Sequence, residues 1–106
     1  MNTLNTYRLR ILREVAARGT LAAAADALYL TGPAVSHQMT TLERELGVPL
    51  FERTARSLRL TEAGRRLVRR SETILSECEA AVAEVQSFSS EVAGTVRRPP
   101  IRATRC

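Results

Sequence analysis

The chain has 106 residues, of which 44% are apolar and 25% are charged, and its sixteen basic residues against eleven acidic ones give a net charge of +5. This length predicts one small domain, and the apolar fraction is too high for a disordered basic tail. No apolar run approaches the roughly 18 residues of a membrane span. The first six residues lack the basic and apolar pattern of a secretory leader, so secretion is not expected. Two cysteines fit a reducing compartment rather than a disulfide framework. We therefore expect a cytoplasmic protein that does not associate with membranes.

The residue inventory argues against an enzyme. The chain has one histidine, His37, and its two cysteines, Cys78 and Cys106, are far apart. A zinc site needs three or four close ligands, so we expect no catalytic residue, no metal and no cofactor. All the basic residues are arginine, which favours a polyanionic partner. Codon bias in a GC-rich genome also produces an arginine-only, alanine-rich composition.

The charges are segregated along the chain in a way that codon bias does not explain. Residues 1–70 carry twelve arginines and six acids, a net charge of +6. Residues 71–96 carry five glutamates and no arginine, and the last ten residues have a net charge of +4. The first seventy residues are therefore predicted to face the polyanion.

Two helices are predicted before residue 30. Apolar residues recur at helical spacing from Leu9 to Ala16, and Gly19 ends that segment. Residues 21–28 are almost entirely alanine and leucine, and Thr20 can cap their helix. The small side chains of this second helix allow another helix to approach closely.

A third helix is predicted over about 32–46, with Thr31 as its N-cap and Gly47 at its end. Helix, short turn and helix is the arrangement of a DNA-reading module, whose second helix enters the major groove. The face opposite the predicted buried stripe carries Pro33, Ser36, His37, Thr40 and Arg44. These side chains can meet phosphates or base edges, but they are also typical of a solvated helix surface.

A hairpin and a long helix are predicted next. Residues 50–53 and 57–60 have the pattern of two short strands, with the tip at 54–56. Thr61 can cap a helix over about 62–92, which would be about 45 Å long. Its apolar residues recur as a heptad seam that the domain's own core can cover only in the first turns, so a second copy of the chain is the expected partner. The residues predicted to form this dimer contact are Leu67, Ile74, Cys78, Ala81, Val82, Val85 and Phe88.

Four segments carry a resemblance to a known family. Residues 20–28 (TLAAAADAL), 33–38 (PAVSHQ), 42–53 (LERELGVPLFER) and 60–64 (LTEAG) resemble the N-terminal region of the LysR-type transcriptional regulators, over roughly residues 4 to 94. The resemblance implies a mainly α fold: a winged helix-turn-helix of three helices and a two-stranded wing, then a long dimerisation helix. The implied divisions are a DNA-binding domain over 1–61, a linker helix over 62–93 and a basic tail over 94–106.

The resemblance also implies which residues contact DNA. Matched position by position, they are Thr20, Thr31, Pro33, Ala34, Ser36, His37, Gln38 and Arg53. Gly32 stands where relatives often have glutamine or proline, and His37 stands where arginine is common. A single imidazole nitrogen cannot make the two-pronged contact of arginine with guanine, so the operator sequence cannot be copied from a relative.

The function implied is sequence-specific binding of promoter DNA by a bacterial transcription regulator, with double-stranded DNA and a second copy of the chain, as a homodimer or a higher oligomer, as its partners. Family members continue into an effector-binding domain, whereas residues 98–106 carry prolines and arginines that cannot form its buried first strand. We therefore expect a disordered tail on a truncated chain, and no small-molecule effector. The alternative is an interaction protein that pairs with full-length relatives through its linker helix and modulates them.

Overall fold

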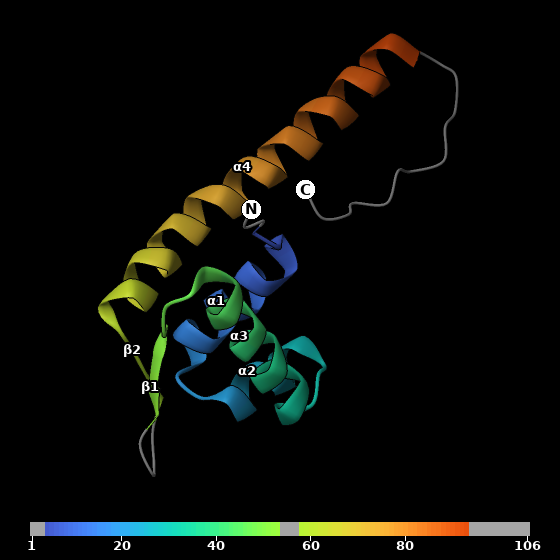
Figure 1. Ribbon diagram of the computed structural model, residues 1–106. Helices are drawn as coiled ribbons and strands as arrows, with labels where there is room; N and C mark the ends of the chain where they lie inside the picture. The colour runs from blue at the N-terminus through green and yellow to red at the C-terminus, as the bar shows by residue number, and fades with distance from the viewer. Residues whose placement is uncertain (1–3, 54–57, 94–106) are drawn as a thin grey trace.

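The computed structural model describes residues 4–53 and 58–93, which form a helical core, a two-stranded wing and one long helix (Figure 1). The elements in chain order are α1 (Thr6–Arg18), α2 (Leu21–Leu28), α3 (Gly32–Leu46), β1 (Phe51–Arg53), β2 (Leu58–Leu60) and α4 (Glu62–Ala93). This architecture confirms the predicted winged helix-turn-helix and the long helix that follows it.

The ends of the first three helices are set by the residues that the sequence indicates. The side chains of Thr20 and Thr31 each accept a hydrogen bond, 3.1 Å long, from the backbone N–H three residues later. Gly19 and Gly47 follow α1 and α3 in the left-handed conformation, with φ of 87° and 74°. Glycine takes this conformation without the clash that a Cβ causes, so both helices end cleanly.

One hydrophobic core holds α1, α2 and α3 together. Ala24 and Ala25 of α2 are buried within it, which allows the close helix approach expected from small side chains. The wing adds Leu50 and Phe51 to the same cluster. The other members of this cluster are Ile11, Leu12, Val15, Val35, Met39 and Leu42.

The wing is attached to α3 through one carboxylate. Glu43 Oε2 accepts hydrogen bonds from the backbone N–H groups of Leu50, at 2.7 Å, and Phe51, at 3.2 Å. β1 then pairs with β2 in antiparallel register, with Phe51 opposite Leu60. The predicted tip of this hairpin, at 54–56, lies outside the described residues.

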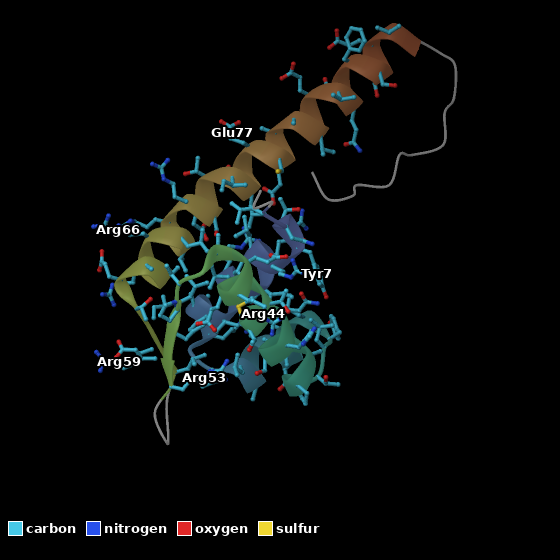
Figure 2. The ribbon with its side chains drawn as sticks, in the orientation of Figure 1. Tyr7, Arg44, Arg53, Arg59, Arg66 and Glu77 are labelled. Atoms are coloured by element: carbon cyan, nitrogen blue, oxygen red, sulfur yellow. The ribbon has the colours of Figure 1, made fainter. Side chains whose placement is uncertain are left out.

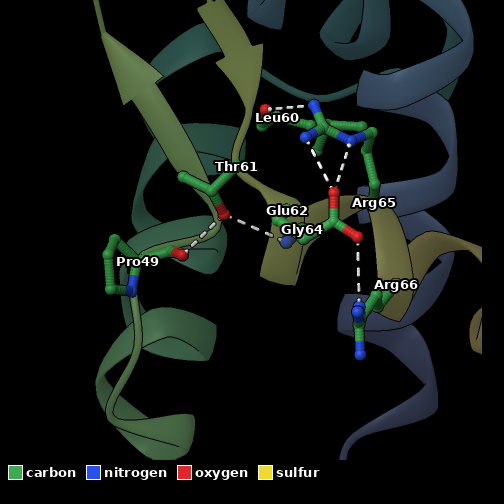
Figure 3. A network of polar contacts seen from close by, with 7 residues as sticks. All are labelled: Pro49, Leu60, Thr61, Glu62, Gly64, Arg65 and Arg66. Atoms are coloured by element: carbon green, nitrogen blue, oxygen red, sulfur yellow. Dashed lines mark hydrogen bonds and ion pairs between the residues drawn. The ribbon is translucent and has the colours of Figure 1, made fainter.

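The first turn of α4 is fixed against the wing (Figure 3). Thr61 Oγ1 donates a hydrogen bond to the carbonyl oxygen of Pro49, at 2.8 Å, and accepts one from the backbone N–H of Gly64, at 3.0 Å. A Cβ on Gly64 would overlap the carbonyl oxygen of Leu50, so only glycine allows this approach. The Thr-Glu-Ala-Gly run at 61–64 therefore sets where the long helix leaves the domain.

Only the first half of α4 packs on its own domain. Ser71 and Leu75 are fully buried, at 0% and 1% exposure. The second half runs past the helical core (Figure 1), and it leaves Val85, Phe88 and Val92 between 59% and 68% exposed. None of the helices in the described ranges is long and apolar enough to cross a membrane.

Candidate nucleic-acid interface

The helix α3 turns one apolar face inward and one polar face outward. Val35, Met39 and Leu42 are at most 1% exposed, so they fix the rotation of the helix about its axis. On the opposite side Pro33 and His37 are exposed, and the exposed residues continue to Arg44, which Figure 2 labels. Ala34, Ser36 and Thr40 are half-buried at the sides of this face. The structure thus brings the predicted Pro33, Ser36 and His37 together on the first turns of one helix.

Two helix N-termini in this region are open to an anion. Neither α2 nor α3 has an acidic residue in its first turn, so the positive end of each helix dipole is not neutralised locally. Thr20 and Thr31 cap these two ends and are exposed. Each side-chain oxygen already accepts a backbone N–H, but its hydroxyl proton can still be donated. A phosphate group matches this arrangement.

Gln38 lies on the α1 side of α3, and its contacts restrict what it can recognise. Its Oε1 accepts a 2.9 Å hydrogen bond from Nε of Arg8. The same guanidinium binds both carboxylate oxygens of Glu45, at 3.0 and 3.1 Å. With this bond made, Gln38 keeps its NH₂ donors and one lone pair of Oε1 for another partner. The bond to Arg8 fixes the direction of the amide, so Gln38 can meet a base edge only in this orientation.

The wing presents a basic surface. Arg53 ends β1 opposite Leu58 and is exposed, although strand alternation places it on the same face as the buried Phe51. Arg59 projects from β2 on the outer side of the wing, and Figure 2 labels both arginines. In the part of the chain that the structure describes, neither forms an ion pair, and the same holds for Arg10, Arg13, Arg44, Arg69 and Arg70. These free cations can attract a phosphate backbone.

The start of α4 differs because an acid stands there. Glu62 pairs with Arg65 at 2.9 Å and with Arg66 at 3.1 Å (Figure 3). The hydrogen bond from Arg65, followed by that from Arg66, lowers the pKa of Glu62. Arg65 also donates to the carbonyl oxygen of Leu60 at 3.1 Å. This helix start is therefore neutralised within the domain.

The roles of three residues in this region were not predicted from the sequence. Arg8 holds Gln38, Glu43 holds the wing, and Tyr29 occupies the turn between α2 and α3. Glu43 lies within the specific 42–53 run, so the motif itself carried a signal for it. Arg8 and Gln38 are thirty positions apart, and no local pattern links them. No group of three potential metal ligands occurs among the described residues.

The heptad residues of α4 divide into two groups. Leu67 packs against the domain's own core, and Ile74, Cys78 and Val82 are half-buried. Ala81, Val85 and Phe88 are exposed. The free part of the predicted dimer contact therefore lies in the second half of the helix.

Comparison with known proteins identifies the family that shares this arrangement. Residues 6–65 match the family model for bacterial regulatory helix-turn-helix proteins of the lysR family. A probable RuBisCO transcriptional regulator of Trichormus variabilis is 44% identical over 89 residues, which are 84% of this chain and 26% of the relative. The corresponding Synechocystis protein is 40% identical over the same shares. The chain thus spans about a quarter of the length of these curated relatives.

Solved structures agree with the sequence match. The crystal structure of a CbnR_DBD–DNA complex aligns with 81% of this chain and 99% of its own, at 31% identity and a TM-score of 0.78. A BenM_DBD complex with catB site 1 DNA aligns with 82% of this chain and 97% of its own, at 29% identity and a TM-score of 0.79. With the recognition helix, the wing and the long helix all in place, the chain belongs to the LysR family of bacterial regulatory helix-turn-helix proteins.

Proposed function

We propose that this chain binds promoter DNA sequence-specifically, with the N-terminal turns of α3 in the major groove and the wing on the adjacent backbone. The observation that carries the proposal is the outward face of α3, where Pro33, Ser36 and His37 lie together beside an unneutralised helix start. Two family members with the same fold have been solved as DNA complexes. The free arginines would supply sequence-independent attraction, and the side chains of α3 would select bases.

The test is a binding titration against the DNA upstream of the protein's own coding sequence and against an unrelated duplex of equal length. We expect tighter binding to the upstream DNA, and affinity for both duplexes that falls steeply as salt rises. A Ser36→Ala/His37→Ala variant should lose the preference while keeping the weaker, salt-dependent binding. Ser76→Ala, on the exposed surface of α4, is the matched control. Affinity that depends on neither sequence nor salt contradicts the proposal.

We further propose that the second half of α4 pairs with a second copy of the chain. Ala81, Val85, Phe88 and Val92 recur at intervals of four, three and four, so they form one apolar stripe that the chain's own domain does not cover. Two such helices would bury each other's stripes and hold two recognition helices at a fixed separation, which suits a site with two half-sites. The same stripe also fits the linker helix of a full-length relative, which is the alternative function.

Sedimentation equilibrium tests the pairing. Val85→Asp should shift the chain toward the monomer, because it places a charge in the centre of the stripe. Ala83→Asp adds the same charge on the opposite side of the helix and should leave the association unchanged. In cells, regulation that survives Ser36→Ala/His37→Ala but not Val85→Asp would favour the alternative, in which pairing with relatives is the function.

A further inference from the structure

The turn between α2 and α3 holds a tyrosine in a backbone conformation that tyrosine disfavours. Tyr29 ends α2 with φ of 58° and ψ of 39°, in the left-handed region. It is the only non-glycine residue with a positive φ among those that the structure describes. The equivalent positions after α1 and α3 are Gly19 and Gly47. Glycine or asparagine takes this conformation more easily than an aromatic residue does.

The turn itself explains the conformation but not the choice of side chain. The backbone N–H of Leu30 donates to the carbonyl oxygen of Ala25 at 2.9 Å, and that of Tyr29 donates to Asp26 at 3.3 Å. These two bonds form the helix-ending motif that requires a left-handed residue at position 29. The motif uses only backbone atoms of that residue, so glycine would serve it better.

Intramolecular packing does not explain the tyrosine either. Tyr29 is 95% exposed, more than any other large hydrophobic residue that the structure describes. Its phenol makes no hydrogen bond within the described ranges. An exposed aromatic ring on a strained backbone gains nothing from the fold, and such residues concentrate at functional sites.

The position of Tyr29 indicates its ligand. It lies two residues before Thr31, the N-cap of α3, and α3 presents Pro33 and His37 from its first turns. If those turns enter the major groove, the chain just before the N-cap lies at the groove edge, where the phosphates run. A phenol O–H can donate to a phosphate oxygen, and its ring has only two torsions to immobilise.

We propose that Tyr29 donates a hydrogen bond from its phenol to a DNA phosphate at the edge of the groove that α3 enters. This contact rests on the proposed DNA-binding function. It strengthens binding to every sequence equally, because a phosphate carries no base identity. A tyrosine thus occupies a left-handed position where glycine would be more stable, because the tyrosine side chain binds the DNA.

The test compares stability with affinity in two variants. Tyr29→Gly should raise the melting temperature, because glycine relieves the backbone strain, yet weaken binding to both duplexes about tenfold through loss of a hydrogen bond to a charged group. Tyr29→Phe keeps the ring and the melting temperature and should show most of the same loss. The salt dependence of binding should not change, because the phenol is neutral. Tyr7→Phe, on α1, is the matched control at the chain's other tyrosine.

Each outcome decides the assignment. If Tyr29→Phe binds both duplexes as tightly as the unmutated chain, the phosphate contact is overturned, whether or not Tyr29→Gly weakens binding. Loss of affinity for the upstream DNA alone also overturns it, because that result would mean base recognition. If the unmutated chain binds neither duplex, the proposed function fails and this assignment fails with it. If only the Tyr29 substitutions lack the expected effect and the unmutated chain still prefers the upstream DNA, the proposed function stands.

Discussion

The helix α3 and the second half of α4 leave opposite kinds of surface uncovered. α3 buries its apolar stripe in the core, with Val35 and Leu42 at 0% exposure, and turns its polar face outward. The distal turns of α4 leave their apolar side exposed, including Val85 and Phe88. Both helices are amphipathic, so helical periodicity alone would describe them in the same way.

The difference shows where the domain's own folding requirements end. The apolar residues of α3 stabilise the domain by their burial, whereas those beyond Leu75 in α4 gain little within the monomer. A polar face with free donors matches DNA, and an apolar stripe matches another helix. Each helix leaves exposed the surface that its proposed partner requires.

The prediction with the largest expected effect tests this difference between α3 and α4 directly. Leu42→Ala should lower the free energy of unfolding by about 2–5 kcal/mol, because it opens a cavity in the core. Val85→Ala should change it by less than about 0.5 kcal/mol when measured at a concentration low enough for the chain to be monomeric. Urea unfolding followed by circular dichroism measures both. Equal losses in the monomer would mean that the exposed stripe of α4 also stabilises the single domain.

The second prediction concerns the joint between the wing and α4. Gly64→Ala should destabilise the domain by about 1–3 kcal/mol, because the added methyl group meets the carbonyl oxygen of Leu50. Gly32→Ala is the matched control in α3, because apart from its chain neighbours and the helix's own backbone no atom lies within 4 Å of the position that its methyl group would take. It should leave stability unchanged or raise it by up to about 1 kcal/mol. A harmless Gly64→Ala would show that the joint can shift to accommodate the methyl group.

Much of this contrast was predictable from sequence because it depends on local patterns. Gly19, Gly47 and the two threonine caps act within a few residues, so they marked the helix ends correctly. The heptad spacing predicted that α4 would outrun its core. The eight DNA-contact residues remain predictions, and the structure shows only how they are placed. For Gln38 in particular, the partner Arg8 comes from a different helix, and only the packing of α1 against α3 brings them together.

Tyr29 shows a second limit of sequence reasoning. A break in helical pattern is visible after Leu28, but a left-handed residue after a helix is usually predicted from a glycine or an asparagine. A tyrosine gives no such signal. Its conformation becomes apparent only when the backbone bonds from Leu30 and Tyr29 to α2 are seen. A residue type that its backbone conformation disfavours is thus hard to predict from sequence, and once the structure places it, it points to a role outside folding.

The third prediction tests how α3 is held against α1. Arg8→Met should lower stability by about 1–2 kcal/mol, because it leaves Gln38 and the half-buried Glu45 without their partner. It should also weaken DNA binding if the free amide of Gln38 changes its orientation. Arg18→Met, which removes an exposed pair with Glu14, should cost no more than about 0.5 kcal/mol. Equal effects would indicate that the Arg8 contacts are no more than surface pairs.

The smallest expected effect sharpens the contrast at the helix starts. α4 carries Glu62 in its first turn, whereas α3 carries no acid there, so only α3 remains open to an anion. Because hydrogen bonds from Arg65 and then Arg66 lower the pKa of Glu62, its ionised form is favoured in the folded state. Its contribution to stability is therefore present above the pKa of an unfolded glutamate, and it is lost as the pH falls through the lowered folded value.

Glu62→Gln should consequently reduce stability slightly at pH 7, and this difference should shrink as the pH falls through the lowered pKa of the folded-state carboxyl. Urea midpoints at several pH values for the variant and the unmutated chain measure this difference. A constant difference across the range would mean that Glu62 acts through packing rather than charge. Placing the acid in α3 instead, as Ala34→Glu, should weaken DNA binding by up to about fivefold, because an acid at a helix start offsets the helix dipole by about 0.3–1 kcal/mol.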